Sequence, residues 1–109
     1  MTAGRHPTGD PDVADVPGAS RYEILSDGEL AGFADYRLGG GRMAFTHTEV
    51  APPVGRRGLG TRLARAALDD ARRRGLSVVP YCPFIAAFIR RNPAYADLVD
   101  PAHRDLLDP

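Results

Sequence analysis

The segment that most constrains this chain runs from Glu49 to Ala64, in the middle of the sequence. A β-rich, charge-poor stretch ends at Pro52 and Pro53, a short turn of arginine and glycine follows, and a predicted helix begins at Gly58. Proline has no N–H to donate to a sheet, so the two prolines end the strand. The first N–H groups of a helix have no partner within the helix, and they carry the positive end of its dipole. A strand, a glycine-rich turn and a helix N-terminus in this order therefore predict a site for a phosphate-bearing ligand.

The turn from Gly55 to Gly60 narrows the class of phosphate ligand. Its glycines allow phosphates to approach the backbone, and Arg56 and Arg57 add forked, charged donors. The turn lacks the final Lys-Ser/Thr of a nucleoside-triphosphate loop, and its glycine spacing does not match a dinucleotide fingerprint. Two interpretations stay open: the pyrophosphate of another coenzyme, such as coenzyme A, or an ordinary glycine-rich cap of a helix.

Composition limits the chain to one small, charge-balanced domain. With 109 residues, 43% of them hydrophobic, the chain can build one core. The 14 basic and 14 acidic residues give a net charge of zero, which argues against nucleic acid as a partner. The hypothesis that the Arg-rich helix binds nucleic acid therefore ranks last. One cysteine allows no internal disulfide. Because no long apolar run or signal pattern is seen, we expect a cytoplasmic protein with no membrane contact.

Hydrophobic periodicity and turn residues predict an α+β fold. Residues 1–20 are rich in Gly, Pro and Asp and are predicted to form a disordered leader. Strands are predicted at 21–25, 30–38, 42–51 and 76–81, helices at 58–74 and 84–91, a last helical turn at 94–99 and a loose tail at 100–109. The longer helix is a crossover that makes the strands on either side of it parallel. We expect a mixed β-sheet of about four to five strands with one long crossover helix and one short C-terminal helix.

The glycine-rich turn resembles the acetyl-CoA-binding motif of the GNAT N-acetyltransferase superfamily, which reads Gln or Arg, two residues, Gly, one residue, and Gly or Ala. Gly58 and Gly60 match the last two marked positions, and Gly55 stands where Gln or Arg is usual. The strings at 47–50, 79–85 and 89–95 resemble, in order and spacing, the small stand-alone GNAT-like domains called YjdJ-type. The resemblance covers 22–99, so the expected domain spans 21–99.

The resemblance implies an acetyl-CoA-dependent N-acetyltransferase that acts on an unknown amine. In that superfamily two parallel strands splay apart at the acyl group, and the pantetheine arm runs between them. A hypothesis from a different class is a module that binds CoA or acetyl-CoA as a sensor or adaptor, without efficient turnover. The cofactor-binding residues implied here are Val50, Gly55, Arg56, Arg57, Gly58, Leu59, Gly60, Thr61 and Asn92.

The acceptor side of such a domain is expected to be open. The interval from Leu25 to Leu30 leaves room only for a turn, so the helices that normally wall the acceptor in this superfamily are missing. This predicts a large acceptor, such as a protein or peptide amine, or a partner that completes the pocket. We expect a monomer or a weak homodimer, and no metal.

Three side chains are candidates for the chemistry. Cys82 follows a strand and precedes a helix, so it could carry the acetyl group or protonate the departing CoA thiolate; alternatively it is a small buried hydrophobe. Alternation along 42–51 places His47 and Glu49 on the same face as Met43 and Phe45. Either His47 or Glu49 could accept a proton from the incoming amine, and either could instead be structural or solvated.

Overall fold

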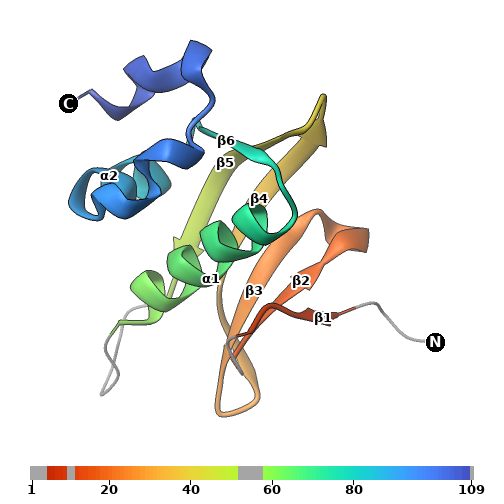
Figure 1. The fold of residues 1–109 in the computed structure, drawn as a ribbon. Coiled ribbons are helices and arrows are strands. Elements are labelled where there is room, and N and C mark those ends of the chain that lie inside the picture. The colour runs from red at the N-terminus through yellow and green to blue at the C-terminus, as the bar shows by residue number, and fades with distance from the viewer. Residues whose placement is uncertain (1–4, 10–11, 52–57, 109) are drawn as a thin grey trace.

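The computed structural model describes residues 5–9, 12–51 and 58–108. Its helices and strands form one sheet with helices on one side (Figure 1). The strands are β1 (His6–Pro7), β2 (Val13–Val16), β3 (Arg21–Ser26), β4 (Glu29–Gly39), β5 (Arg42–Val50) and β6 (Ser77–Pro80). The α-helices are α1 (Leu59–Arg73) and α2 (Pro83–Arg91). The described residues also form the 3-10 helices η1 (Pro17–Ala19), η2 (Pro93–Leu98) and η3 (Pro101–Leu107). Among the described residues, no helix is long and apolar enough to cross a membrane.

The sheet is mixed, as predicted. Its strand order is β1-β2-β3-β4-β5-β6; the first five strands pair antiparallel, and β5 and β6 pair parallel. Tight turns join β3 to β4 and β4 to β5, with Asp27 and Gly28 at φ 53° and 81° and Gly40 and Gly41 at φ 58° and 75°. Left-handed φ at both central residues matches the twist of two antiparallel strands. The helix α1 connects β5 to β6, so the predicted crossover is confirmed.

One face of the sheet is covered by α1, which crosses it diagonally (Figure 1). The apolar stripe of α1 is buried throughout, from Leu59 and Leu63 to Ala71. It packs against the inward side chains of the strands, which include Tyr22, Ile24, Met43 and Phe45. We call this covered side the helical face. The opposite side, which we call the open face, carries Phe33, Asp35, Arg37, Ala44, His47 and Glu49.

The disordered leader predicted at 1–20 is wrong for the part of it that the structure describes. Residues 13–16 form β2 and pair with β3, while Val13 is 2% exposed and Asp15 only 6%. The buried Asp15 carboxylate accepts a hydrogen bond from the Tyr36 hydroxyl at 2.5 Å and a contact from Arg74 at 3.2 Å. These partners lie far away in the sequence, so the local Gly, Pro and Asp content gave a misleading signal.

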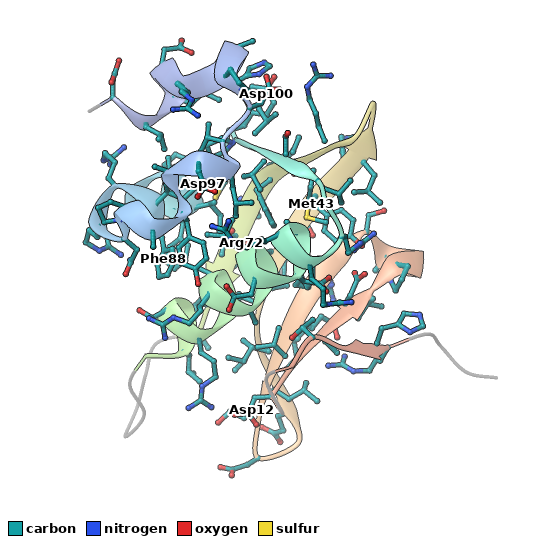
Figure 2. The ribbon with its side chains drawn as sticks, in the orientation of Figure 1. Asp12, Met43, Arg72, Phe88, Asp97 and Asp100 are labelled. Carbon is teal, nitrogen blue, oxygen red and sulfur yellow. The ribbon has the colours of Figure 1, made fainter. Side chains whose placement is uncertain are left out.

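The loose tail predicted at 100–109 is also wrong for residues 100–107. Asp100, which Figure 2 labels between η2 and η3, donates its backbone N–H to the Val78 carbonyl at 2.9 Å. Its carboxylate accepts from Arg42 at 3.2 Å and contacts His103 Nδ1 at 2.7 Å. Leu107 packs against the core. The tail therefore docks on β6 and α2 through contacts with residues distant in the sequence.

A β-bulge in β5 overturns the predicted face of His47 and Glu49. Tyr36 pairs with Phe45 and Asp35 pairs with His47, so Thr46 is an extra residue. The bulge reverses the alternation, and the two polar side chains point to the open face while Phe45 stays in the core. The burial cost of a carboxylate and an imidazole is thereby avoided.

Candidate active site

The parallel strands β5 and β6 pair only over four residues and then part. Their ladder runs from Arg42↔Ser77 to Phe45↔Pro80. Pro80 has no N–H, and the chain then turns, with the Cys82 N–H donating to the Phe45 carbonyl at 2.9 Å before α2 begins. In the described part of the chain, no strand pairs with this edge of β5 over 46–50. One edge of β5 is therefore unpaired from the point where the two strands separate, and we call this edge, over residues 46–50, the cleft edge.

The backbone orientation of β5 beyond the bulge decides what this edge offers. The Ala51 N–H donates to the Ala31 carbonyl of β4 at 2.7 Å. Since successive residues of a strand direct their N–H and C=O groups to alternate edges, Thr48 and Val50 direct theirs to the edge that β6 leaves. An extended ligand can hydrogen-bond to such an edge as an added strand would.

This edge leads to the N-terminus of α1, where the structure supports an anion site. Gly58 caps the helix in the left-handed region, with φ 75° and ψ 13°, and a Cβ built there meets nothing within 4 Å. In the described residues no side chain caps this end, and the first turn holds no acidic residue. Within the described residues, the N–H groups of the first turn, including that of the exposed Thr61, therefore have no side chain bound to them. The predicted residues Gly55, Arg56 and Arg57 lie outside the described residues.

Two of the predicted cofactor residues in this turn of α1 have packing roles. A Cβ on Gly60 would lie 2.7 Å from Cζ of Phe84, so the glycine allows the Phe84 ring of α2 to rest against α1. Leu59 is 9% exposed and belongs to the core. Val50, at the end of β5, is half-buried and packs on the same core. The close approach at Gly60 thus serves contact between helices.

Cys82 lies at the N-terminal cap of α2, on the helical face of the cleft. It is 3% exposed, and its Sγ donates to the Thr48 Oγ1 at 3.3 Å. Thr48 lies on β5 beyond the bulge, opposite the buried Ala34. The thiol and the hydroxyl therefore face each other across the point where β5 and α2 diverge. Thr48 was not identified from the sequence, because a threonine in a strand gives no signal of such a contact.

His47 and Glu49 meet on the open face of the same strand. The His47 Nε2 and Glu49 Oε2 atoms are 2.8 Å apart, and the side chains are 55% and 65% exposed. The His47 ring lies beside Phe33, with centroids 6.0 Å apart. The structure thus brings the two predicted bases together. It places them on the other side of β5 from Cys82, so that the cleft edge lies between the two groups.

Asn92 lies apart from the cleft edge, at the C-terminal end of α2. Its Nδ2 donates to the Phe88 carbonyl at 2.9 Å, which satisfies one of the last carbonyls of the helix. The side-chain amide therefore has a capping role within the chain. Any contact of Asn92 with a cofactor stays a prediction.

The most strongly shifted pKa values belong to a buried cluster at the C-terminal end of α1. Burial raises the pKa of Tyr22 well above its usual range, and the negative charge of Asp15 adds to the rise. The Tyr22 hydroxyl donates to Asp70 Oδ2 at 2.6 Å, and Arg74 Nη1 lies 3.4 Å from both atoms. The pKa of Tyr36 is raised by burial and by its hydrogen bond to Asp15. We call these five residues the buried cluster; it ties α1 to the first strands.

The fold and the cleft edge together define a class of protein. In this class a mixed sheet has two parallel strands that splay apart beside the N-terminus of a crossover helix. The chain belongs to the GCN5-related N-acetyltransferase family, whose model matches residues 21–98. The resemblance to a small GNAT-like domain is therefore confirmed.

A solved structure has the same fold. It is the solution NMR structure of a GCN5-like candidate N-acetyltransferase from Staphylococcus aureus, with a TM-score of 0.61 and 22% sequence identity. The match covers 74% of this chain and 81% of that chain. At this identity the likeness supports the fold alone. A comparison with curated proteins found no match.

Proposed function

We propose that this chain transfers an acetyl group from acetyl-CoA to a primary amine. The observation that carries the proposal is the edge of β5 over 46–50, which β6 leaves open and which leads to the N-terminus of α1. The pantetheine amides would pair with the backbone of Thr48 and Val50. The pyrophosphate would bind the N–H groups at Gly58 to Thr61. Membership of the acetyltransferase family supports the same donor.

The His47–Glu49 pair is proposed as the proton acceptor. The thioester supplies an activated acetyl carbon; the amine nitrogen bonds to it, and the carbon–sulfur bond breaks. The amine must lose a proton as the amide forms, and a general base of this kind contributes about 10²–10⁴-fold to the rate. Glu49 lies 2.8 Å from His47, so the carboxylate stabilises the imidazolium that results. Both side chains are exposed on the open face, from which an acceptor can approach.

Cys82 is proposed to return a proton to the departing CoA thiolate. In its contact with Thr48 the thiol is the donor, at 3.3 Å. A thiol held as a donor is suited to giving up a proton, and the Thr48 hydroxyl can pass it on. The second hypothesis for Cys82 makes it an acetyl carrier, in which the thiol attacks the thioester, releases CoA and then passes the acetyl group to the amine. Mass spectrometry after incubation with acetyl-CoA alone separates the two, because only the carrier becomes acetylated without an acceptor.

The binding half of the proposal is tested at Thr61. Thr61→Asp adds a negative charge to the first turn of α1, where it favours the helix but repels a pyrophosphate. We expect the Kd for CoA, measured by isothermal titration calorimetry, to rise about tenfold, which corresponds to about 1.4 kcal/mol. Thr61→Asn is the matched neutral control and should leave the Kd close to that of the unmodified chain. Equal CoA affinities for the two variants would exclude the N-terminus of α1 as the pyrophosphate site.

The catalytic half is tested by thiol release from acetyl-CoA in the presence of lysine-bearing peptides. Glu49→Gln and His47→Ala are expected to lower kcat by at least about 100-fold while the Kd for acetyl-CoA stays unchanged. Binding of acetyl-CoA without turnover of any amine would favour the sensor or adaptor hypothesis. No heat of binding with millimolar CoA would exclude both the acetyltransferase and the sensor or adaptor hypothesis.

A further inference from the structure

A cavity lies on the open face, at the opposite end of β5 from Glu49. Its volume is about 410 Å³. Its floor is formed by Ala44 and Val79, which are paired across β5 and β6. The walls include Arg37, Arg42, Tyr81 and His103. The last of these side chains comes from η3, so the docked tail builds one wall of the cavity.

The charge in this cavity is positive. Arg42 and His103 share one carboxylate, that of Asp100, at 3.2 and 2.7 Å. The hydrogen bond from His103, followed by that from Arg42, lowers the pKa of Asp100, so this carboxylate stays ionised. Within the part of the chain that the structure describes, Arg37 has no carboxylate partner. One arginine therefore stands uncompensated at the rim, beside a second whose charge is shared.

The cavity also has an aromatic wall. Tyr81 follows β6 and is 54% exposed, which is unusual for a large ring in so small a domain. Its ring meets the His103 ring edge-on, with centroids 6.0 Å apart and an interplanar angle of 76°. The two rings support each other without filling the cavity. A planar anionic group, such as a carboxylate, fits between a guanidinium and such a wall.

The distance from this cavity to the proposed base is set by β5 itself. Ala44 and His47 lie on the same face, three residues apart along the strand, with the bulge between them. At about 3.3 Å per residue the separation is about 10 Å. The far end carries the carboxylates of Glu49 and Asp35, and its one arginine from β3, Arg21, is paired with Glu23; the near end carries Arg37 and Arg42. The open face is therefore dipolar along β5.

We propose that the acceptor is an amine that carries a carboxylate about 10 Å from its reacting nitrogen. The ammonium end is drawn to Glu49 and Asp35, and the carboxylate binds Arg37 in the cavity beside Tyr81. A lysine side chain with an acidic residue close by in a peptide has this chemistry. The proposal rests on the acetyl transfer proposed above, and it names the class of substrate.

The test compares two blocked peptides, each with one lysine, which differ only in aspartate or asparagine two residues away. With saturating acetyl-CoA, we expect kcat/KM for the aspartate peptide to exceed that for the asparagine peptide by about tenfold. In Arg37→Gln this ratio should fall toward one. Arg65→Gln, an exposed arginine on α1 over the helical face, should keep the ratio. A ratio near one in the unmodified chain, or a ratio unchanged by Arg37→Gln, would overturn the proposal.

A binding measurement separates failure of this proposal from failure of the proposed function. The aspartate peptide alone, titrated into the ¹⁵N-labelled chain, should shift amide signals around Tyr81 and His103 and should not do so in Arg37→Gln. These shifts without any acetylation would support the cavity as a carboxylate site and count against the acetyl transfer. Acetylation without any such shifts would leave the transfer standing and overturn the cavity.

Discussion

The contribution of the buried cluster to stability can be measured by removing one hydroxyl. Tyr22 is fully buried, and its hydroxyl donates at 2.6 Å to Asp70, which is 2% exposed. Among the described residues, Tyr22→Phe leaves the Asp70 Oδ2 with the Arg74 Nη1 as its one partner, at 3.4 Å. A hydrogen bond to a buried charged group contributes about 1.5–3 kcal/mol. For a domain of this size each kcal/mol shifts Tm by about 4 °C, so we expect Tm to fall by about 6–12 °C.

The chain supplies a matched control for this experiment. The Tyr95 hydroxyl donates to Asp69 at 2.7 Å, which is the same chemistry at nearly the same distance, but this pair is exposed to solvent. Water can replace the lost hydroxyl there, so Tyr95→Phe is expected to cost at most about 0.5 kcal/mol.

Urea unfolding followed by circular dichroism gives the free energies of unfolding for the unmodified chain and for both variants. The m-values must agree between the three proteins for the comparison to report stability alone. Equal losses in Tyr22→Phe and Tyr95→Phe, or a loss below about 0.5 kcal/mol in Tyr22→Phe, would refute the reasoning that burial makes this hydrogen bond count.

Three further outcomes are expected. Burial raises the pKa values of Tyr22 and Tyr36, so their contribution to folding stability is complete below pH 10 and is lost as pH rises above it. The free energy of unfolding should therefore fall between about pH 10 and 12, and it should fall less steeply in Tyr36→Phe. Gly60→Ala should lower the stability of the unmodified chain by about 1–3 kcal/mol through its clash with Phe84, but should raise it by up to about 1 kcal/mol in a Phe84→Ala background, as thermal unfolding can show. Leu107→Ala should cost about 1–2 kcal/mol in urea unfolding, whereas a loose tail would make it neutral.

The sequence predicts the parts of this fold whose signals are local. The breaks between strands at Asp27–Gly28 and Gly40–Gly41, and the helix α1, follow from residue type and spacing alone. From these elements the crossover and the parallel pairing of β5 with β6 follow by connection rules. The family motif at Gly58 and Gly60 was also readable, since it depends on residues close together in the sequence.

The errors share a different physical origin. The strand β2 and the helix η3 are held by groups far away in the sequence: Asp15 by Tyr36 and Arg74, and Asp100 by Arg42. Both segments are rich in proline or aspartate and poor in long apolar runs, so their local preference is for irregular structure. A buried carboxylate with distant partners outweighs that preference, and no window of sequence contains the information.

The bulge at Thr46 shows how one residue decides the site. Strict alternation from Met43 and Phe45 would have buried His47 and Glu49, and the polarity of these two residues was the signal that the alternation breaks. The extra residue leaves every later pair with β4 in register, from Asp35↔His47 to Gly32↔Val50, so the sheet keeps its core. The same insertion thus turns the proposed base toward the acceptor side and places Thr48 beside Cys82.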